Sequence, residues 1–478
     1  MQLKIKRNIT FAMALSAVLS PLGAFAVDSQ PEAPVLSLDE CLSIALDENP
    51  TIRIADLEVK RMDYSKKEVI GQFLPSIDFG GSYSRTLAKQ TMYMDFGALG
   101  GFGGGAGEGE SGAEEAQSRA SDKKASGMKV GLDNSYSVGF QASMPLIAPQ
   151  LWKNLSISDT QIARALEQSR SSKLDLVNQV KSAYYAYMLA FASKEVMKES
   201  YDMARLTYET YSKQFAVGAA SDYDVLRTSV AMKNIEPELL QADIAIKQAR
   251  LQLQILMGVD ASFEFRPAGA LSDYEGSMTV PAAGVAEDLC SNPTLRLNTI
   301  DLELQRKALA TQKLAYVPTL ALTANYNWTS MNNGAPFKNL LWSPYSMIGL
   351  QLSVPIFSGG QRYSRVKQAQ VQLTELELQR ENLERSVNMQ VTLAVDNIRI
   401  NVEQIRSCVE SVGQAERAHD IMTRSFDLGA ASYLDLRDSE LALTRARLAY
   451  YQAIYNYLVA NSDLELLLGT ANVATAQK

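Results

Sequence analysis

Side chains that could perform acid–base, metal or thiol chemistry are few in this chain. One histidine, His419, occurs among 478 residues, which excludes a multi-histidine metal site and leaves one candidate for histidine acid–base chemistry. The cysteines Cys41, Cys290 and Cys408 are odd in number and far apart, which argues against a disulfide framework although one pair remains open. No Ser/His/Asp, metal-spaced or phosphate-loop pattern occurs. We expect a protein that is not an enzyme and holds no cofactor.

Net charge and composition further narrow the class of protein that this chain can be. The chain has 46 Lys and Arg against 53 Asp and Glu, a net charge of −7, whereas nucleic-acid-binding proteins carry basic patches. Apolar residues make up 46% and charged residues 21%, which is ordinary for folded protein. We therefore expect a folded chain with no nucleic-acid partner.

Residues 1–26 have the pattern of a signal peptide. Three cations precede an apolar stretch over 9–22, and Ala-Phe-Ala at 24–26 is the small-x-small pattern that signal peptidase cleaves. A membrane anchor is the alternative, but the stretch is short and is broken by a proline and a glycine. Cleavage after residue 26 removes three cations and no acid, so the net charge becomes −10. We expect an exported protein.

A long internal repeat organises the rest of the chain. Asn49-Pro50 recurs as Asn292-Pro293, and Phe-x-x-Gly-Ala-Ala-Ser begins at both Phe215 and Phe426. The first unit carries an insertion, in which nine of the 16 residues over 97–112 are glycine. We expect a mobile loop over 97–128, since such a segment buries little apolar surface. The expected units are 27–260 and 284–469, with a linker over 261–283 and a tail over 470–478.

Four segments alternate apolar and polar residues, which predicts strands with one apolar face. In the first, Ile77, Phe79 and Tyr83 share one parity and small polar residues take the other. Each segment has the length that a tilted strand needs to cross a bilayer. A soluble sandwich with one wet face is the alternative, but the signal peptide and aromatic strand ends favour a membrane. The four predicted strands cover about 76–87, 135–146, 319–328 and 346–356.

Four strands cannot close a barrel in one chain. Open sheet edges are not tolerated in hydrocarbon, and the smallest single-chain barrels have eight strands. Several subunits must therefore pool their strands, and three chains would supply twelve.

Two helical hairpins are expected, over 150–257 and 359–468. Pro149 to Lys213 contains no further Pro or Gly, and sixty-odd helical residues span roughly 95 Å. Gly218 would end the first long helix and Ser221 would cap its return helix, which Pro237 should interrupt and kink. Narrow apolar stripes require side-by-side packing, so a coiled-coil scaffold is an alternative interpretation.

These features together resemble the TolC family of outer-membrane efflux and secretion channels. The resemblance spans about 36–469, and its most specific motif is Phe-x-x-Gly-Ala-Ala-Ser-x-x-Asp at both hairpin tips. It implies an α+β membrane protein with two tandem repeats of a long antiparallel α-hairpin plus two β-strands. Such chains trimerise into a 12-stranded β-barrel on an α-helical tunnel. The tunnel ends in an iris of hairpin tips that meets an adaptor protein.

The resemblance also implies a selectivity gate. Asp435 and Asp438 occupy the positions of the family's two aspartate rings and, three residues apart, share a helix face. In a homotrimer, six carboxylates round one aperture would favour cations and raise each other's pKa values. Ordinary first-turn aspartates that interact with the helix dipole are the alternative.

The expected lock of that gate departs from the family pattern. Asp224 would be the polar anchor of the closed iris, but its usual tyrosine and arginine partners fall on Phe426 and Ala431. Arg227 or Arg437 could substitute for them. The residues expected to contact the adaptor are Gly218, Ala219, Ala220, Ser221, Gly429, Ala430, Ala431 and Ser432.

The function implied is a passive exit channel of a tripartite efflux pump or type I secretion system. It would lie in the outer membrane of a Gram-negative bacterium, contact outer-membrane lipid, and work with a periplasmic adaptor and an inner-membrane RND or ABC transporter. A periplasmic coiled-coil adaptor or scaffold without a pore is the alternative. Adaptors of that kind carry one hairpin, whereas this sequence predicts two hairpins and four strands.

Overall fold

The computed structural model describes residues 34–93, 127–281 and 289–471. The expected signal peptide and most of the expected glycine-rich loop lie outside these residues. The helices are α1 (Leu38–Glu48), α2 (Pro50–Gly71), α3 (Pro149–Ala216), α4 (Asp222–Met257), the 3₁₀ helix η2 (Leu271–Ser277), α5 (Pro293–Leu314), α6 (Gln361–Asp427) and α7 (Tyr433–Leu468). The strands are β1 (Val35–Leu36), β2 (Ser76–Arg85), β3 (Gln90–Tyr93), β4 (Gly127–Val130), β5 (Asn134–Ile147), β6 (Arg266–Pro267), β7 (Thr319–Asn332) and β8 (Ser343–Ser353).

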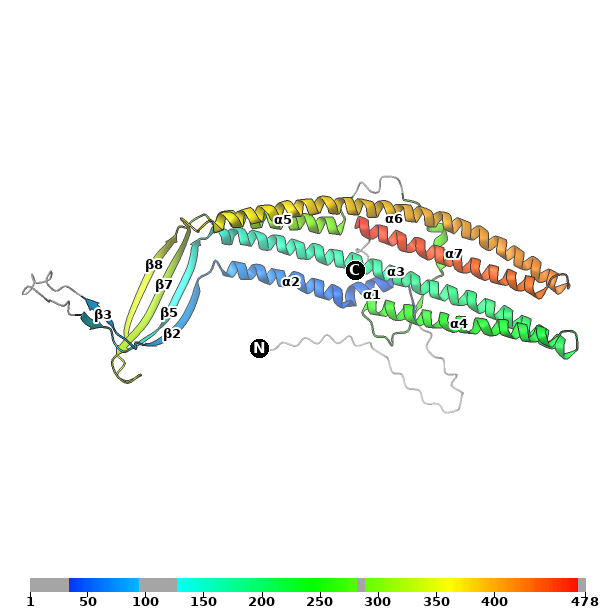
Figure 1. The fold of residues 1–478 in the computed structure, drawn as a ribbon, viewed down its shortest axis with the longest axis horizontal. Helices are drawn as coiled ribbons and strands as arrows, with labels where there is room; N and C mark the ends of the chain where they lie inside the picture. The colour runs from blue at the N-terminus through cyan, green and yellow to red at the C-terminus, as the bar shows by residue number, and fades with distance from the viewer. Residues whose placement is uncertain (1–33, 94–126, 282–288, 472–478) are drawn as a thin grey trace, which may run out of the picture.

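The molecule is strongly elongated, with a sheet at one end and hairpin tips at the other (Figure 1). Helices α2 and α5 lead toward the sheet, α3 and α6 run away from it, and α4 and α7 return from the far tips toward the middle. Helix pairs α3 with α4 and α6 with α7 form the two hairpins. The α+β class expected from the sequence is confirmed.

The four long strands form one antiparallel sheet in the order β2-β5-β7-β8. One face is lined by aromatic rings, with Phe79 and Phe140 at 4.9 Å between centroids and Phe140 and Trp328 at 6.3 Å. The opposite face is polar, and there the Ser76 and Ser143 hydroxyls lie 2.9 Å apart. Strands β2 and β8 are the two edges of this sheet, so a single chain leaves it open.

The ends of the strands differ from those expected. Strand β7 continues to Asn332, and β8 covers Ser343–Ser353 rather than 346–356. β8 stops before Pro355, whose ring removes the N–H that a ladder needs. Pro145 remains inside β5, where the pairing with β7 shifts between Pro145 and Ile147, as expected for a proline at a bulge.

A second, two-stranded ladder continues beyond the sheet. Strands β3 and β4 pair over Gln90–Tyr93 and Gly127–Val130. The expected loop over 97–128 therefore needs a correction, because Gly127 and Met128 belong to β4. Alternation over four residues is too short a signal to predict such a ladder from the sequence.

The two outward helices are continuous and long. Helices α3 and α6 have 68 and 67 residues, which corresponds to about 100 Å each. The interruption expected at Pro237 does not occur: α4 is one continuous helix from Asp222 to Met257, with Pro237 inside it. One lost hydrogen bond is outweighed by packing along the rest of the helix. Among the described residues, no helix has both the length and the apolar character needed to cross a membrane.

The main hydrophobic core lies midway along the helices. The segment expected as a linker contributes to it, since Phe265 and Leu271 are buried and β6 pairs in parallel with β1. The hydroxyl of Tyr187 on α3 donates to the Phe265 carbonyl over 2.7 Å. Tyr184 donates to the Leu36 carbonyl over 3.0 Å. The connection between the repeats is therefore held against the long helix α3.

Each repeat closes on itself through the same asparagine clasp. Asn49 caps the start of α2 and donates 2.7 Å to the Leu256 carbonyl near the end of α4. Asn292 caps α5 and donates 2.6 Å to the Leu467 carbonyl near the end of α7. Both return helices end at glycines with positive φ, Gly258 at 71° and Gly469 at 67°. A Cβ on Gly469 would lie 2.1 Å from the Ser291 carbonyl oxygen, so this approach requires glycine.

We expect Asn292→Ala to destabilise the protein by about 2 kcal/mol, because it removes a helix cap and a hydrogen bond between helices. Thermal unfolding of the purified protein measures this loss. Asn298→Ala is the matched control on the same helix, since its buried side-chain oxygen accepts no hydrogen bond. Equal melting temperatures for the two variants would contradict the clasp.

Candidate functional site at the hairpin tips

The two hairpin tips have the same backbone geometry. Gly218 and Gly429 end the outward helices in the left-handed conformation, with φ of 75° and 74°. The next amide in each tip reaches five residues back, which closes the last helical turn. These bonds join Ala219 N to Gln214 O and Ala430 N to Ser425 O, each over 2.8 Å. The repeated Phe-x-x-Gly-Ala-Ala-Ser motif therefore encodes a repeated turn.

The aspartates of the motif belong to capping boxes. Ser221 donates through its hydroxyl to Asp224 over 2.6 Å, and Ser432 donates to Asp435 over 2.7 Å. The backbone N–H of each serine also donates to the same carboxylate. Hydrogen bonds from the Ser432 side chain and backbone lower the pKa of Asp435. The rise in aspartate pKa expected from the sequence requires the carboxylates of neighbouring copies. Within one chain the pKa of Asp435 is lowered instead.

Asp435 and Asp438 are both exposed, whereas Leu436 between them is buried. The two carboxylates therefore lie on the outer side of the first turns of α7. The repeat offset places Arg227 of α4 at the position of Asp438. The two return helices thus present opposite charges at equivalent sites.

An aromatic and cationic cluster joins the two hairpins at their tips. Tyr433 of α7 packs edge-on against Tyr211 of α3, with 5.8 Å between centroids, and Tyr211 lies 6.2 Å from Phe426 of α6. The guanidinium carbon of Arg227 on α4 lies 4.8 Å from the centroid of the Tyr433 ring. Burial, and next the carboxylate of Asp224, raise the pKa of Tyr211. We call Tyr211, Arg227, Phe426 and Tyr433 the tip cluster.

The residues expected to hold the gate closed each make a defined contact in the structure. Arg227 belongs to the tip cluster, and Arg437 donates to the Tyr433 hydroxyl over 3.4 Å. Phe426 contacts Tyr211, while Asp224 bonds its own cap serine instead of a group on the second hairpin. Tyr211 and Tyr433 were not predicted from the sequence. The first repeat has Asp222 where the second has Tyr433, and this break in a matched motif is the signal that could have identified it.

The tips themselves present apolar surface. Val217 and Leu428, directly before the turn glycines, are 80% and 84% exposed. The expected adaptor-contacting residues lie beside them, over 218–221 and 429–432, and most are exposed. Each turn therefore combines one exposed apolar side chain with several small side chains.

Farther from the tips, Arg447 of α7 binds Glu416 of α6 over 3.0 Å and also binds Glu199 of α3. His419 lies nearby, with Nδ1 3.3 Å from the Ser439 hydroxyl. Burial, followed by Arg447, lowers the pKa of His419. Within the described ranges, no group of three or more His, Cys, Asp or Glu side chains could hold a metal ion. The single histidine thus connects α6 to α7.

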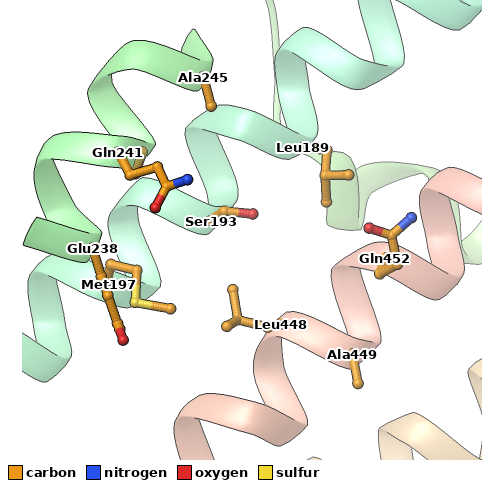
Figure 2. Close-up of a pocket in the computed structure, with 10 residues that line it drawn as sticks. Leu189, Ser193, Met197, Glu238, Gln241, Ala245, Leu448, Ala449 and Gln452 are labelled. Carbon is orange, nitrogen blue, oxygen red and sulfur yellow. The ribbon is translucent and has the colours of Figure 1, made fainter. Parts of the chain in front are cut away.

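Between the tips and the core, a groove of about 530 Å³ separates the hairpins. Figure 2 shows Leu448, Ala449 and Gln452 of α7 on one side and residues of α3 and α4 on the other. Its lining is small, apolar or amide, with Glu238 as the charged member. Across this groove α4 and α7 are apart, and the first hairpin contacts α7 through α3, to which the tip cluster and Arg447 add contacts.

The fold and these tips define a membrane-inserted tunnel protein, with a sheet that is aromatic on one face and long hairpins ending in matched turns. The chain belongs to the outer membrane efflux protein family, which it matches over residues 41–259 and 285–470. The TolC outer membrane protein of Escherichia coli K12 is 22% identical over 351 residues, covering 71% of this chain and 70% of the relative. The cobalt-zinc-cadmium resistance protein CzcC of Cupriavidus metallidurans is 24% identical, covering 62% of this chain and 68% of that protein.

A solved structure has the same fold. The Campylobacter jejuni CmeC outer membrane channel superposes with a TM-score of 0.69 at 16% identity, covering 98% of this chain and 95% of that one. Family membership confirms the resemblance found in the sequence. The protein is an outer-membrane efflux channel of a Gram-negative bacterium, with a large periplasmic part. The scaffold alternative is therefore not supported, and the family consists of channels rather than enzymes.

Proposed function

We propose that the protein is the exit channel of a tripartite efflux pump or type I secretion system. It conducts substrates passively from an inner-membrane transporter across the periplasm and the outer membrane. The observation that carries this proposal is the open four-stranded sheet with one aromatic face, joined to hairpins of about 100 Å.

The open sheet edges favour a homotrimer. β2 and β8 have one strand neighbour each in the chain, and hydrocarbon does not tolerate unpaired backbone groups. Three copies give twelve strands, an even number in the range of known barrels. The helices support the same assembly, since α4 and α6 carry exposed apolar side chains that neighbouring copies would cover. These are Leu226, Val230, Leu240 and Ile244 on α4, and Leu378, Met389, Leu393 and Ile400 on α6.

The hairpin tips are the proposed docking point for a periplasmic adaptor, which would connect the channel to an RND or ABC transporter. Val217 and Leu428 supply apolar contacts, and the adjoining turns supply small side chains. Asp435 and Asp438 form the proposed selectivity gate on the same tips, and the tip cluster holds that gate closed. CzcC is named as a cobalt-zinc-cadmium resistance protein, and we leave the cargo of this channel open.

The purified protein should be a trimer that forms channels in planar bilayers. Membrane fractionation, native mass spectrometry and single-channel recording test location, assembly and conduction in turn. In cells, a photocrosslinker at Ala430 should capture an adaptor, whereas one at the exposed Lys60 on α2 should not. A monomer without conductance would refute the proposal.

A further inference from the structure

The four-stranded sheet is almost free of charge. Strands β5, β7 and β8 contain no Asp, Glu, Lys or Arg, and β2 contains only Asp78 and Arg85. A charged side chain on a strand of bilayer length is costly on the lipid side and tunes selectivity on the lumen side. The face on which each charge lies therefore decides what it does.

Asp78 lies on the polar face. It shares the parity of Ser76, whose hydroxyl meets that of Ser143 across the ladder. Ile77 and Phe79, on the opposite parity, belong to the apolar face, where Phe79 packs against Phe140. The same polar face continues across the sheet, where Asn327 donates to the Tyr345 hydroxyl over 3.2 Å.

Arg85 has the opposite placement. It shares the parity of Tyr83 at the last position of β2, where the sheet ends. The guanidinium contributes to the low pKa of Asp133, after the hydrogen bonds and the charge of Lys89. Arg85 therefore belongs to the outer rim of the apolar face, and Asp78 is the single charged side chain on the polar face of the four strands.

The surroundings of Asp78 leave its charge uncompensated. Its row across the sheet continues through Gln141 and Asn325, both neutral. Within the part of the chain that the structure describes, Asp78 is exposed and forms no ion pair or side-chain hydrogen bond. In the same row, the side-chain oxygen of Asn325 is buried without a donor. Asp78 is the third residue of β2, about 7 Å from the start of the strand next to α2.

We propose that Asp78 determines ion selectivity inside the barrel, separately from the aspartates of the hairpin tips. This rests on the proposed trimeric channel, in which three Asp78 carboxylates form one negative ring where the tunnel meets the barrel. The wall around them is neutral, so the ring raises the local concentration of cations and lowers that of anions. Substrates with positive charge are favoured at this point even when the tips are open.

The competing explanation is that Asp78 only protects an edge strand. Inward-pointing charges on edge strands prevent wrong pairing between chains, and β2 is an edge until the trimer forms. An edge-protecting role predicts changes in trimer yield and none in selectivity. The reversal potential of the assembled channel separates the two explanations.

The experiment measures K⁺ against Cl⁻ permeability of trimers in planar bilayers under a KCl gradient. The background carries Asp435→Asn with Asp438→Asn, so that the tip aspartates do not contribute. At about 10 mM salt the Debye length is about 30 Å, and there we expect Asp78→Asn to lower the permeability ratio about twofold. Asp78→Lys should shift it further toward anions. Arg85→Gln, which neutralises the other charge of the sheet on its opposite face, is the matched control and should leave the ratio unchanged.

The outcomes separate this proposal from the function on which it rests. If the unsubstituted protein forms no channel, the proposed function fails and the selectivity ring fails with it. If the channel conducts and neither Asp78 variant changes the reversal potential, the ring alone is refuted and Asp78 is an edge-protecting residue. A graded shift from Asp to Asn to Lys supports the ring.

Discussion

Tyr433→Ala should convert the closed channel into a leaky one. The substitution removes the ring that stacks on Arg227 and packs against Tyr211, and with it the acceptor of the Arg437 bond. If the proposed gate is closed by this cluster, the cation–π contact and the aromatic pair together contribute about 2 kcal/mol in each chain, which is about 30-fold in the closed-to-open equilibrium. We expect the mean conductance of trimers in planar bilayers to rise at least about tenfold.

Two variants test whether the tip cluster is the cause. Tyr433→Phe keeps the ring and loses the hydroxyl, so its conductance should stay near that of the unsubstituted channel. Tyr223→Ala removes a tyrosine that is 68% exposed in the first turn of α4, and it should change nothing. If Tyr433→Ala and Tyr223→Ala conduct equally, the two hairpins are not held by this cluster.

Asp435→Asn combined with Asp438→Asn should abolish most of the cation preference at the tips. In the proposed gate the pair removes six negative charges from the aperture of a trimer, and a narrow aperture with low-dielectric walls concentrates such a field. Asparagine at 435 keeps an acceptor for Ser432, so the cap survives while the charge is lost. We expect the K⁺ to Cl⁻ permeability ratio to fall about fivefold or more at low salt, as measured from the reversal potential.

Ser432→Ala provides the complementary control. It removes the cap, at about 1 kcal/mol, and keeps both carboxylates. Its selectivity should therefore match that of the unsubstituted channel even if its tips are less stable. A loss of selectivity in Ser432→Ala as large as in the double variant would mean that tip structure, and not charge, sets the preference.

The long elements could be predicted because they follow from local rules. The absence of further Pro or Gly between Pro149 and Lys213 and the period-2 alternation of the four strands each define an element without reference to the rest of the chain. The ends of strands were less predictable, since β7 extends to Asn332 through its pairing with β5. The helix around Pro237 also depends on tertiary contacts, because the packing of α4 against α3 outweighs the local helix-breaking effect of the proline.

The tip site was only partly predictable for a related reason. The motif indicates that Asp224 and Asp435 follow the turns, and both lie in the first turn of a return helix, but the serine three residues earlier decides what their carboxylates bind. Tyr211 and Tyr433 come from different hairpins, so their contact depends on how two long helix pairs lie together. No spacing within either hairpin reports that arrangement.

The asparagine clasps hold the C-terminal ends of the two return helices, so a rotation of either helix would be centred there. Helices α4 and α7 have 36 residues each, and each ends beside its own clasp, held by Asn49 or Asn292. Each return helix is about 54 Å long, so a rigid rotation of about 10° at its clasp would move its tip end by about 9 Å. Because α4 and α7 have the same length, equal rotations would move their tip ends by equal distances, and the six return helices of a trimer would widen its aperture evenly.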